Sequence, residues 1–420
     1  MMHLLFPAIL VAGALFQSSV LAKTQPAQNV LTSGSDYAHL HLTNDLLAFH
    51  KNLTQIESIS GNEHEVGVWL TKSLESQGYT VEQQSLGGKP PRFNLLAWPG
   101  SKRETRVLLS SHIDTVPPFW PYTHDATTGV ITGRGSVDAK GSVATQVLAL
   151  NGLLESGEVR PDDVSLLFVV DEEVGGDGMR QANLLGLKPK SIIFGEPTEG
   201  KLASGHKGNL GVKLVAKGKA AHSGYPWLGR SANEVLIAAL AGVMETVKDL
   251  PASKKYGLTT MNIGRMEGGV AANVVPQDAT ASLAFRIADG TPSMIKEKVL
   301  ESVSRAVTGF IEEGESTDDV AEVVFTSEGY GPVAIDADVP GFSQIVVNYG
   351  TDIPNFDNTV DGQKRYLYGP GSILVAHSDH EATTEQELFD AVDGYKALIL
   401  HAMIIDDAGD HPRVGAKPGL

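Results

Sequence analysis

Short apolar runs bounded by polar residues recur along the chain from Arg106 onward, and they alternate with segments of helical periodicity. This alternation is typical of an α/β domain with a mainly parallel sheet and helices on both faces. Four of the runs predict buried strands, at residues 107–109, 164–170, 191–194 and 372–376. We expect helices at residues 42–56 and 142–156, and a closing helix that starts at a capping box of Thr384 and Glu387.

The pattern changes between Lys207 and Glu322. Strands are expected there at residues 212–216 and 280–287, with helices near 231–248 and 293–309. This order predicts an inserted α+β domain at residues 207–322. The catalytic domain would then consist of residues 37–206 and 323–420.

An apolar run opens the chain and ends in small residues up to Ala22. We expect residues 1–22 to be a secretory signal peptide and the protein to be secreted and extracellular. A membrane anchor is the alternative, but Pro7 and Gln17 interrupt a run already short of the roughly 20 apolar residues that a span needs. In a secreted chain, Asn52 of the Asn-Leu-Thr sequon becomes a glycosylation site.

Composition removes several classes of function. A formal charge of −17 disfavours nucleic acid and anionic membrane as partners, and no basic aromatic patch reverses this locally. The absence of cysteine excludes disulfides, thiolate metal ligands and a cysteine nucleophile. Any metal must therefore be held by imidazole and carboxylate groups, from 13 histidines and 50 acidic residues.

Side chains able to bind metal stand where the predicted strands stop. In open α/β sheets, ligands bind at the carboxyl ends of the strands, so these side chains are expected to converge on one crevice. Imidazole and carboxylate ligands together suit a pair of divalent cations that share one carboxylate. The residues at the four strand ends are His112 and Asp114, Glu172 and Glu173, Glu196, and His377.

Taken one at a time, these signals are weak. The pair His112 and Asp114 lies on one face of an extended segment, where the carboxylate can orient the imidazole, but such pairs are common. Asp138 lies in a Gly-rich turn before a helical pattern, so a helix N-cap is its alternative role. The adjacent acids Glu172 and Glu173 repel each other unless cations or solvent compensate their charge.

Five motifs in fixed order are more specific than any single one. They are SSHIDTVPP, GRGSVDAKG, DEEVGG, GEPTE and GPGSILVAHS. With this order, the chain resembles the cocatalytic zinc metallopeptidase family of carboxypeptidases, aminoacylases, acetylornithine deacetylases and succinyl-diaminopimelate desuccinylases. The likeness runs from about His112 to the C-terminal helix.

The resemblance implies two Zn²⁺ per subunit, with Co²⁺ or Mn²⁺ as substitutes. By position, Asp138 would bridge both metals, His112 and Glu196 would complete one site, and Glu173 and His377 the other. Glu172 would act as general base, and a carboxylate that binds no metal is suited to take a proton from an acidified water. Asp114 would hold His112 in orientation. The family tends to have Asp or Asn where this chain has His380, so the role of His380 stays open.

The resemblance also implies that the inserted domain is of the ferredoxin-like type and serves as a lid or dimerisation domain. Three residues match family positions that contact the substrate: His222, Asn273 and Arg286. Gly371 lies before the strand expected to lead to His377, and we expect it to line the substrate pocket. Arginine suits a planar carboxylate, and histidine or asparagine can donate to a developing oxyanion. The alternatives are a turn residue for Asn273 and a charge on a strand face for Arg286. In relatives with such an inserted domain a homodimer often forms, and His222 would then act in the active site of the partner.

The leading hypothesis is a secreted metallocarboxypeptidase that hydrolyses the amide bond next to a free C-terminal carboxylate of a peptide. The runner-up is an N-acyl-amino-acid deacylase, which shares the mechanism and differs only in the acyl side of the substrate. A non-catalytic binding protein on the same fold is a third hypothesis. Loss of Glu172 or of a metal ligand would signal it, and none of these residues is missing.

Overall fold

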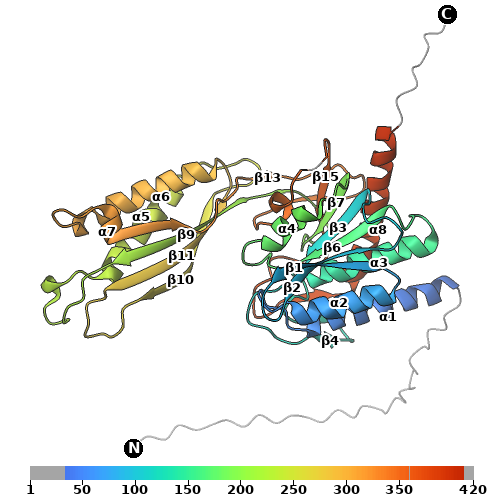
Figure 1. The fold of residues 1–420 in the computed structure, drawn as a ribbon, viewed down its shortest axis with the longest axis horizontal. Helices are drawn as coiled ribbons and strands as arrows, with labels where there is room; N and C mark the ends of the chain where they lie inside the picture. The colour runs from blue at the N-terminus through green and yellow to red at the C-terminus, as the bar shows by residue number, and fades with distance from the viewer. Residues whose placement is uncertain (1–33, 359, 411–420) are drawn as a thin grey trace, which may run out of the picture. The chain divides into compact units, whose positions relative to one another are not determined.

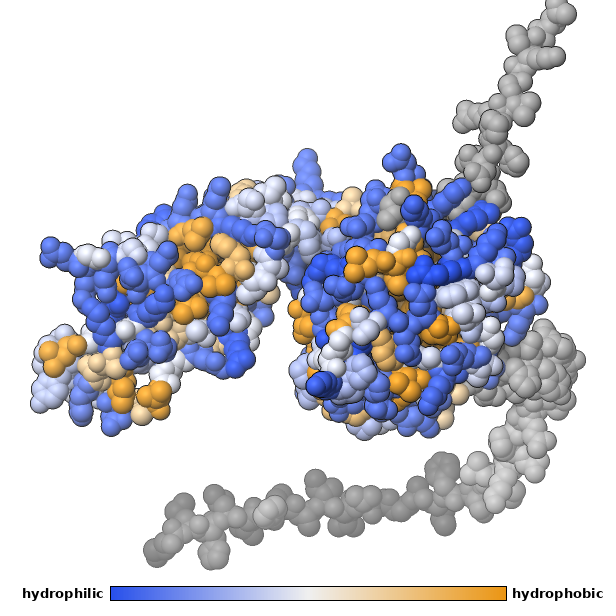
Figure 2. Space-filling model, in the orientation of Figure 1, coloured by the Kyte–Doolittle hydropathy of each residue, from blue (hydrophilic) through white to orange (hydrophobic). Residues whose placement is uncertain are grey.

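The computed structural model describes residues 34–358 and 360–410, so the expected signal peptide at 1–22 lies outside the described residues. No helix in the described part of the chain is both long enough and apolar enough to cross a membrane. On the face drawn in Figure 2, hydrophilic side chains cover most of the surface and hydrophobic ones form smaller groups between them.

A six-stranded sheet forms the centre of the larger α/β region (Figure 1). Its four strands β6, β3, β7 and β15 are parallel, while β1 and β2 add an antiparallel edge. In sheet order the strands are β1 Thr80–Gly87, β2 Arg92–Trp98, β6 Val164–Val169, β3 Val107–His112, β7 Ser191–Gly195 and β15 Lys364–Tyr368. The predicted mainly parallel sheet is confirmed.

Successive side chains along each central strand enter two different cores, because residues of a strand alternate between the two faces of its sheet. Val107 and Leu109 of β3 pack in the core that contains side chains of α1, α2, α3 and α8, whereas Leu108 packs in the core that contains α4. Helices therefore cover both faces, as expected. The helices here are α1 Gly34–Gln55, α2 His64–Ser76, α3 Lys140–Ser156, α4 Asp177–Ala182 and α8 Glu385–Asp410.

The fourth predicted strand, at residues 372–376, is wrong. The strand beside β7 is β15, which ends at Tyr368, and the chain then turns at Gly369–Gly371. Residues 373–377 form turns, in which Val375 N–H donates to Ser372 O and the Ser378 hydroxyl donates to Val375 O. An apolar run of four residues has no periodicity that distinguishes a strand from a turn. Leu374 is 81% exposed, so the run is not a buried element.

The segment after His206 forms a second, antiparallel sheet with the order β10-β11-β9-β12. The chain order strand, helix, strand, strand, helix, strand and this sheet order are those of the ferredoxin-like fold, as predicted. Its helices α5 and α6 pack against each other and against the sheet. The elements are β9 Gly208–Lys217, α5 Ala232–Lys248, β10 Thr260–Gly268, β11 Asp278–Ile287, α6 Pro292–Val307, α7 Thr317–Val320 and β12 Ala321–Phe325. Because β12 continues past residue 322, the limits of the inserted domain stay a prediction.

Two small sheets and four short 3-10 helices complete the fold. One sheet contains β13 Val333–Ala334, β8 Leu202–His206 and β14 Gln344–Val347, and the other contains β16 Ala382–Thr384, β5 Val130–Thr132 and β4 Thr123–Asp125. The 3-10 helices are η1 Asn183–Leu185, η2 Pro226–Leu228, η3 Thr308–Phe310 and η4 Ile353–Asn355.

The N-terminal ends of α8 and α3 test the two helix caps considered from the sequence. The capping box before α8 is confirmed, since Glu387 N–H donates to Thr384 Oγ1 at 3.2 Å and Thr384 N–H donates to Glu387 Oε2 at 2.8 Å. Asp138 is not a helix cap: the N-cap residue of α3 is Ala139, and no side chain caps this end. The alternative role for Asp138 is therefore excluded.

The buried side chain of Lys140 ties the start of α3 to the end of α1. Its Nζ donates to Leu53 O at 3.0 Å and to Ile56 O at 2.8 Å. The last carbonyl groups of a helix have no partner within the helix, so an ammonium group in this place satisfies them. Lys140 thus connects the turn that carries Asp138 to the N-terminal helix.

We predict that Lys140→Met lowers the free energy of unfolding by about 1–3 kcal/mol, because buried carbonyl groups lose their charged donor. Denaturant unfolding of the purified protein measures this change. Lys51→Met is the matched control, since Lys51 is exposed on the same helix. Its effect should stay within about 0.5 kcal/mol. Equal losses in the two variants would contradict the capping role.

Candidate metal centre

Three neighbouring parallel strands end at one edge of the sheet. His112, the last residue of β3, pairs in register with Val169, the last residue of β6, and β7 ends at Gly195. The chain continues from these ends to Asp114, to Glu172 and Glu173, and to Glu196. The edge brings the predicted metal ligands together, as parallel strands in an open sheet require.

The ring of His112 is oriented as a metal ligand. Its Nδ1 lies 3.0 Å from the backbone oxygen of Asp114, which can only accept, so Nδ1 carries the proton. The lone pair of Nε2 is then free, and Nε2 lies 3.2 Å from Asp138 Oδ1 and 3.7 Å from Glu196 Oε1. A second hydrogen-bonded nitrogen that fixes the tautomer is the usual arrangement for a ligating histidine.

Asp138 lies between two histidines. Its Oδ1 faces His112 Nε2, and its Oδ2 lies 3.3 Å from His377 Nε2. His377 Nε2 is also 3.0 Å from Glu173 Oε2. The two oxygens of one carboxylate therefore face different imidazoles, the arrangement that a carboxylate shared by two cations requires.

Ligand atoms form two overlapping groups in the described part of the chain, and within each group all atoms lie within 4.8 Å of one another. One group contains His112, Glu172 and Glu196, and the other contains His112, Asp138 and Glu173. The carboxylate of Glu172 thus lies beside the candidate ligands.

Burial and like charges disfavour ionised carboxylates in this cluster. Burial raises the pKa of Glu172 well above its usual value, and the charge of Glu196 adds to this effect. Burial also raises the pKa of Glu196 to about 8 against the opposing charge of His112, and it raises the pKa of Glu173. Such a cluster is stable in its ionised form only with added positive charge. Divalent cations that prefer nitrogen and oxygen ligands fit this set.

The two histidines respond in the opposite direction. Hydrogen bonds to Asp138 and Glu173 raise the pKa of His377 to about 10. Burial opposes the charged form of His112, but the carboxylates of Glu196, Asp114 and Asp138 raise its pKa well above the usual value. Both imidazoles therefore lie in a strongly negative field, which attracts a cation to their Nε2 atoms.

Asp114 lies beside the imidazole of His112 and also binds the backbone that carries Glu172 and Glu173. Its Oδ1 is 3.4 Å from His112 Nδ1, farther than its own backbone oxygen, so the backbone carbonyl is the nearer partner of the ring. The carboxylate accepts hydrogen bonds from the N–H groups of Glu172 and Glu173, both at 3.1 Å, and from Ser60 Oγ at 2.7 Å. Burial alone would raise the pKa of Asp114, but these donors and His112 hold it below its usual value.

The turn that carries Asp138 is held by Glu381, which the motif analysis did not assign. Glu381 is fully buried, and its Oε1 accepts from the N–H groups of Gly135, Val137 and Asp138. Its Oε2 accepts from Arg134 Nη1 at 2.7 Å. The signal in the sequence was an acid four residues after the last predicted ligand. His380 is exposed, and its Nδ1 lies 2.8 Å from Asp379, so it faces away from this turn.

The four predicted substrate residues lie in three places. His222 and Asn273 belong to neighbouring loops of the inserted segment, where His222 pairs with Val274 and Ser223 N–H donates to Asn273 O. Both side chains are exposed, and His222 Nδ1 accepts from Gly224 N–H. Local bonds therefore leave the Nε2 of His222 open.

Arg286 and Gly371 lie close to the chain segments of the metal centre. Gly371 has a φ of +72°, and a side chain there would meet Val137, the residue before Asp138, at 2.9 Å. Arg286 Nη1 lies 3.2 Å from the place that a side chain at Gly350 would occupy. The positive φ of Gly371 favours glycine there, whereas a side chain at Gly350 would meet the side chains of Tyr330 and Arg286.

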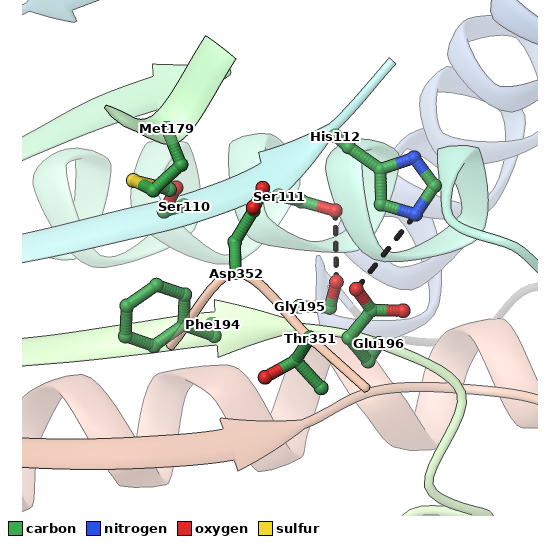
Figure 3. A pocket seen from close by; sticks show the side chains of 9 residues that line it. All are labelled: Ser110, Ser111, His112, Met179, Phe194, Gly195, Glu196, Thr351 and Asp352. Atoms are coloured by element: carbon green, nitrogen blue, oxygen red, sulfur yellow. Dashed lines mark hydrogen bonds and ion pairs between the residues drawn. The ribbon is translucent and has the colours of Figure 1, made fainter. Parts of the chain in front are cut away.

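Asp352 is a buried acid that the sequence analysis missed. With His112 and Glu196 it lines a small pocket behind the centre, drawn in Figure 3. Its Oδ1 accepts from Asn355 Nδ2 at 3.0 Å, and burial raises its pKa to about 6. Asp352 follows a glycine and a threonine in a Gly- and Asp-rich region. Such a composition indicates a loop but does not indicate a buried acid.

Known proteins share both the sequence and the fold. The profile of peptidase family M20/M25/M40 matches residues 108–401. A probable carboxypeptidase of Aspergillus flavus is 48% identical over 384 residues, covering 85% of this chain and 87% of that protein. A probable carboxypeptidase of Aspergillus niger is 47% identical over 403 residues, covering 90% and 95%.

Among solved structures, an M20 family metallo-carboxypeptidase from Sulfolobus solfataricus superposes with a TM-score of 0.65 at 18% identity, covering 86% of this chain and 99% of that one. At this identity the likeness shows the fold alone. The two groups of ligand atoms could hold metal ions, and the match to the family extends over residues 108–401, most of the chain. The chain therefore belongs to the M20/M25/M40 family of metallopeptidases.

Proposed function

We propose that this M20 peptidase is a secreted carboxypeptidase with two zinc ions, which hydrolyses the amide bond next to a free C-terminal carboxylate. The observation that carries the two-metal proposal is Asp138, whose two oxygens face His112 and His377 separately. The names of the fungal relatives, probable carboxypeptidases, support the substrate class. An N-acyl-amino-acid deacylase is the alternative, and the substrate experiment below distinguishes the two.

Five residues would hold the ions. His112 and Glu196 would serve one ion, Glu173 and His377 the other, and Asp138 both. When bound, the ions supply Lewis acidity, which acidifies water and polarises the scissile carbonyl. Asp114 would act on the ligand set by holding the backbone of Glu172 and Glu173.

Glu172 is the proposed general base. Its carboxylate lies beside the candidate ligands His112 and Glu196 and is not one of the five proposed ligands, which leaves it available to accept a proton. The same proton can then pass to the departing amine, as general acid–base catalysis in an amide hydrolase requires.

The substrate would be held by residues of the inserted segment and the turn after β15. Arg286 would bind the terminal carboxylate through its planar guanidinium, which suits a bidentate contact. His222 and Asn273 would donate to the oxyanion, and Gly371 would allow close approach of the backbone. We propose that two copies pair through the inserted domain, which would bring His222 to the partner's centre. The open Nε2 of His222 supports such a role.

Glu172→Gln is expected to retain zinc and lose turnover by about 10²–10⁴-fold, because it removes the proton acceptor while keeping the shape of the side chain. Metal analysis of the purified variant, together with hydrolysis of a blocked dipeptide, measures both effects. Near-normal turnover would rule out Glu172 as the base.

The matched control is Asp138→Ala. One carboxylate is proposed to serve both ions, so this variant should lose zinc from both positions. Zinc loss with Asp138→Ala and retention with Glu172→Gln would separate ligand from base. Full zinc occupancy in Asp138→Ala would refute the bridging role.

Amidation of the substrate's C-terminus should reduce cleavage by the wild-type enzyme. It removes the charge that Arg286 binds and leaves the scissile bond unchanged. A hydrogen bond to a charged group contributes roughly 1.5–3 kcal/mol, so kcat/KM should fall by about one to two orders of magnitude. Arg286→Ala should show a similar loss on the free acid and little further loss on the amide.

Equal cleavage of acid and amide by the wild-type enzyme would exclude the carboxylate contact. N-acetyl amino acids are included in the same assay. Preference for these over blocked dipeptides would favour the deacylase.

Secretion and glycosylation belong to the same proposal. Asn52 is exposed on α1, which supports attachment of a glycan to the secreted chain. Protein recovered from culture medium of the expressing host should begin near Lys23 and lose mass on enzymatic glycan removal. Mass spectrometry checks both, and retention of residues 1–22 in the mature chain would contradict the signal peptide.

A further inference from the structure

The residue before the proposed base has an uncommon backbone conformation. Asp171 has a φ of +70°, and among the described residues only Glu199 and His377 share a positive φ without being glycine. For residues other than glycine this conformation costs roughly 1–2 kcal/mol, although aspartate and asparagine tolerate it best. A conformation of this kind persists only where surrounding contacts enforce it.

The left-handed turn at Asp171 directs two successive N–H groups to one anion. Glu172 N–H donates to Asp114 Oδ1 and Glu173 N–H donates to Asp114 Oδ2. Gly176 N–H closes the turn on Asp171 O at 2.7 Å. Successive amides form such an anion-binding concavity when residues alternate between right- and left-handed conformations. The side chains of Glu172 and Glu173 then enter the two different ligand groups.

Arg92 holds this turn from outside. Its Nη2 lies 2.5 Å from Asp171 Oδ1, and both side chains are largely shielded, at 19% and 13% exposure. The guanidinium is itself fixed by Glu63, with Nε at 2.6 Å from Oε2 and Nη2 at 2.8 Å from Oε1. Glu63 is 1% exposed and also accepts from Gly61 N–H. The guanidinium of Arg92 is thus fixed by charged hydrogen bonds to two carboxylates, which holds it in one orientation against the turn.

We propose that Arg92 and Asp171 are positioning residues that hold the carboxylate of Glu172 in its working orientation. The inference rests on the proposed role of Glu172 as base. Neither residue touches the reacting atoms, and both act through the backbone turn between Asp171 and Gly176. Arg92 of β2 binds Glu63 at the start of α2, and its further bond to Asp171 Oδ1 connects both elements to the turn that carries Glu172.

Asp171→Gly is the main test, because glycine adopts the left-handed conformation freely and lacks the bond to Arg92. It should stay folded, with the thermal midpoint unchanged or raised. At saturating zinc, kcat on a blocked dipeptide should fall about 10- to 100-fold, as expected when a catalytic group is displaced by about 1 Å. KM should change less than about threefold, because the proposed substrate contacts are elsewhere.

Conservative replacement supplies the rescue. Asp171→Asn keeps the tolerance for positive φ and an oxygen that can accept from Arg92, so kcat should stay within about fivefold of wild type. Arg92→Met should lower kcat at least as much as Asp171→Gly, because it also removes the two bonds to buried Glu63, and the double variant should lose no more kcat than Arg92→Met alone. Arg103→Met is the matched control: Arg103 makes a bidentate pair with Glu82 outside the site, and its removal should leave kcat unchanged.

Wild-type kcat in Asp171→Gly, or losses that multiply in the double variant, would overturn the positioning role. Glu172→Gln is assayed in parallel. If that variant stays active, the proposed function fails. If it is inactive while Asp171→Gly is fully active, the proposed function stands and only the positioning role fails.

Discussion

The repulsion among carboxylates at one edge of the central sheet is the constraint on which the rest of this structure depends. Asp138, Glu172, Glu173 and Glu196 lie within a few ångströms of one another and are largely shielded from water, so solvent screens their charges poorly. Two imidazoles compensate part of this negative charge. The Nε2 of His112 faces one oxygen of Asp138, and the Nε2 of His377 faces the other. A cluster of this kind holds its shape only if cations occupy it or if its backbone is fixed against the repulsion. The surrounding structure supplies the second condition.

The fixing is done by a second set of carboxylates that bind backbone amides. Asp114 accepts hydrogen bonds from the backbone N–H groups of Glu172 and Glu173. Glu381 accepts hydrogen bonds from three backbone N–H groups of the turn that carries Asp138. A carboxylate that accepts several N–H groups keeps its charge even when buried, because the hydrogen bonds stabilise the ionised form. Carboxylates therefore have two roles here. Some are candidate metal ligands, and others, Asp114 and Glu381, form an outer layer that anchors the backbone of the ligands. Removal of an anchor would free a loop that carries ligands, so both layers determine the geometry of the centre.

Much of this arrangement could be predicted from the sequence, because parallel strands bring their carboxyl ends to one edge. Three strand runs and their terminal residues, from His112 to Glu196, were enough to predict three of the five proposed ligands, His112, Glu173 and Glu196. His377 was assigned by a motif, while the strand expected before it is a turn, since the apolar run at 373–376 has no periodicity. Glu381 was missed because it binds backbone groups and an arginine more than 200 positions away, which no local pattern encodes. Asp352 was missed because, apart from Thr351, the residues that line its pocket lie more than a hundred positions before it. The same holds for Arg92, whose bond to Asp171 joins residues 79 positions apart.

The anchoring acids raise a further question, since each adds negative charge to a region that already has too much. Each of the outer acids Glu381 and Asp171 is matched by an arginine, with Arg134 at 2.7 Å and Arg92 at 2.5 Å. Asp114 is not paired with an arginine in the described part of the chain. It accepts hydrogen bonds from two backbone N–H groups and one hydroxyl, and it lies 3.4 Å from the Nδ1 of His112. Glu381 is thus neutralised by its own arginine, whereas Arg92 is shared by Asp171 and buried Glu63, and Asp114 is stabilised by its hydrogen bonds and by His112. The field that attracts a cation is set locally, within a few ångströms of Asp138, because charges on the distant surface are screened over about 10 Å. The net charge of −17 therefore has little part in binding the metal.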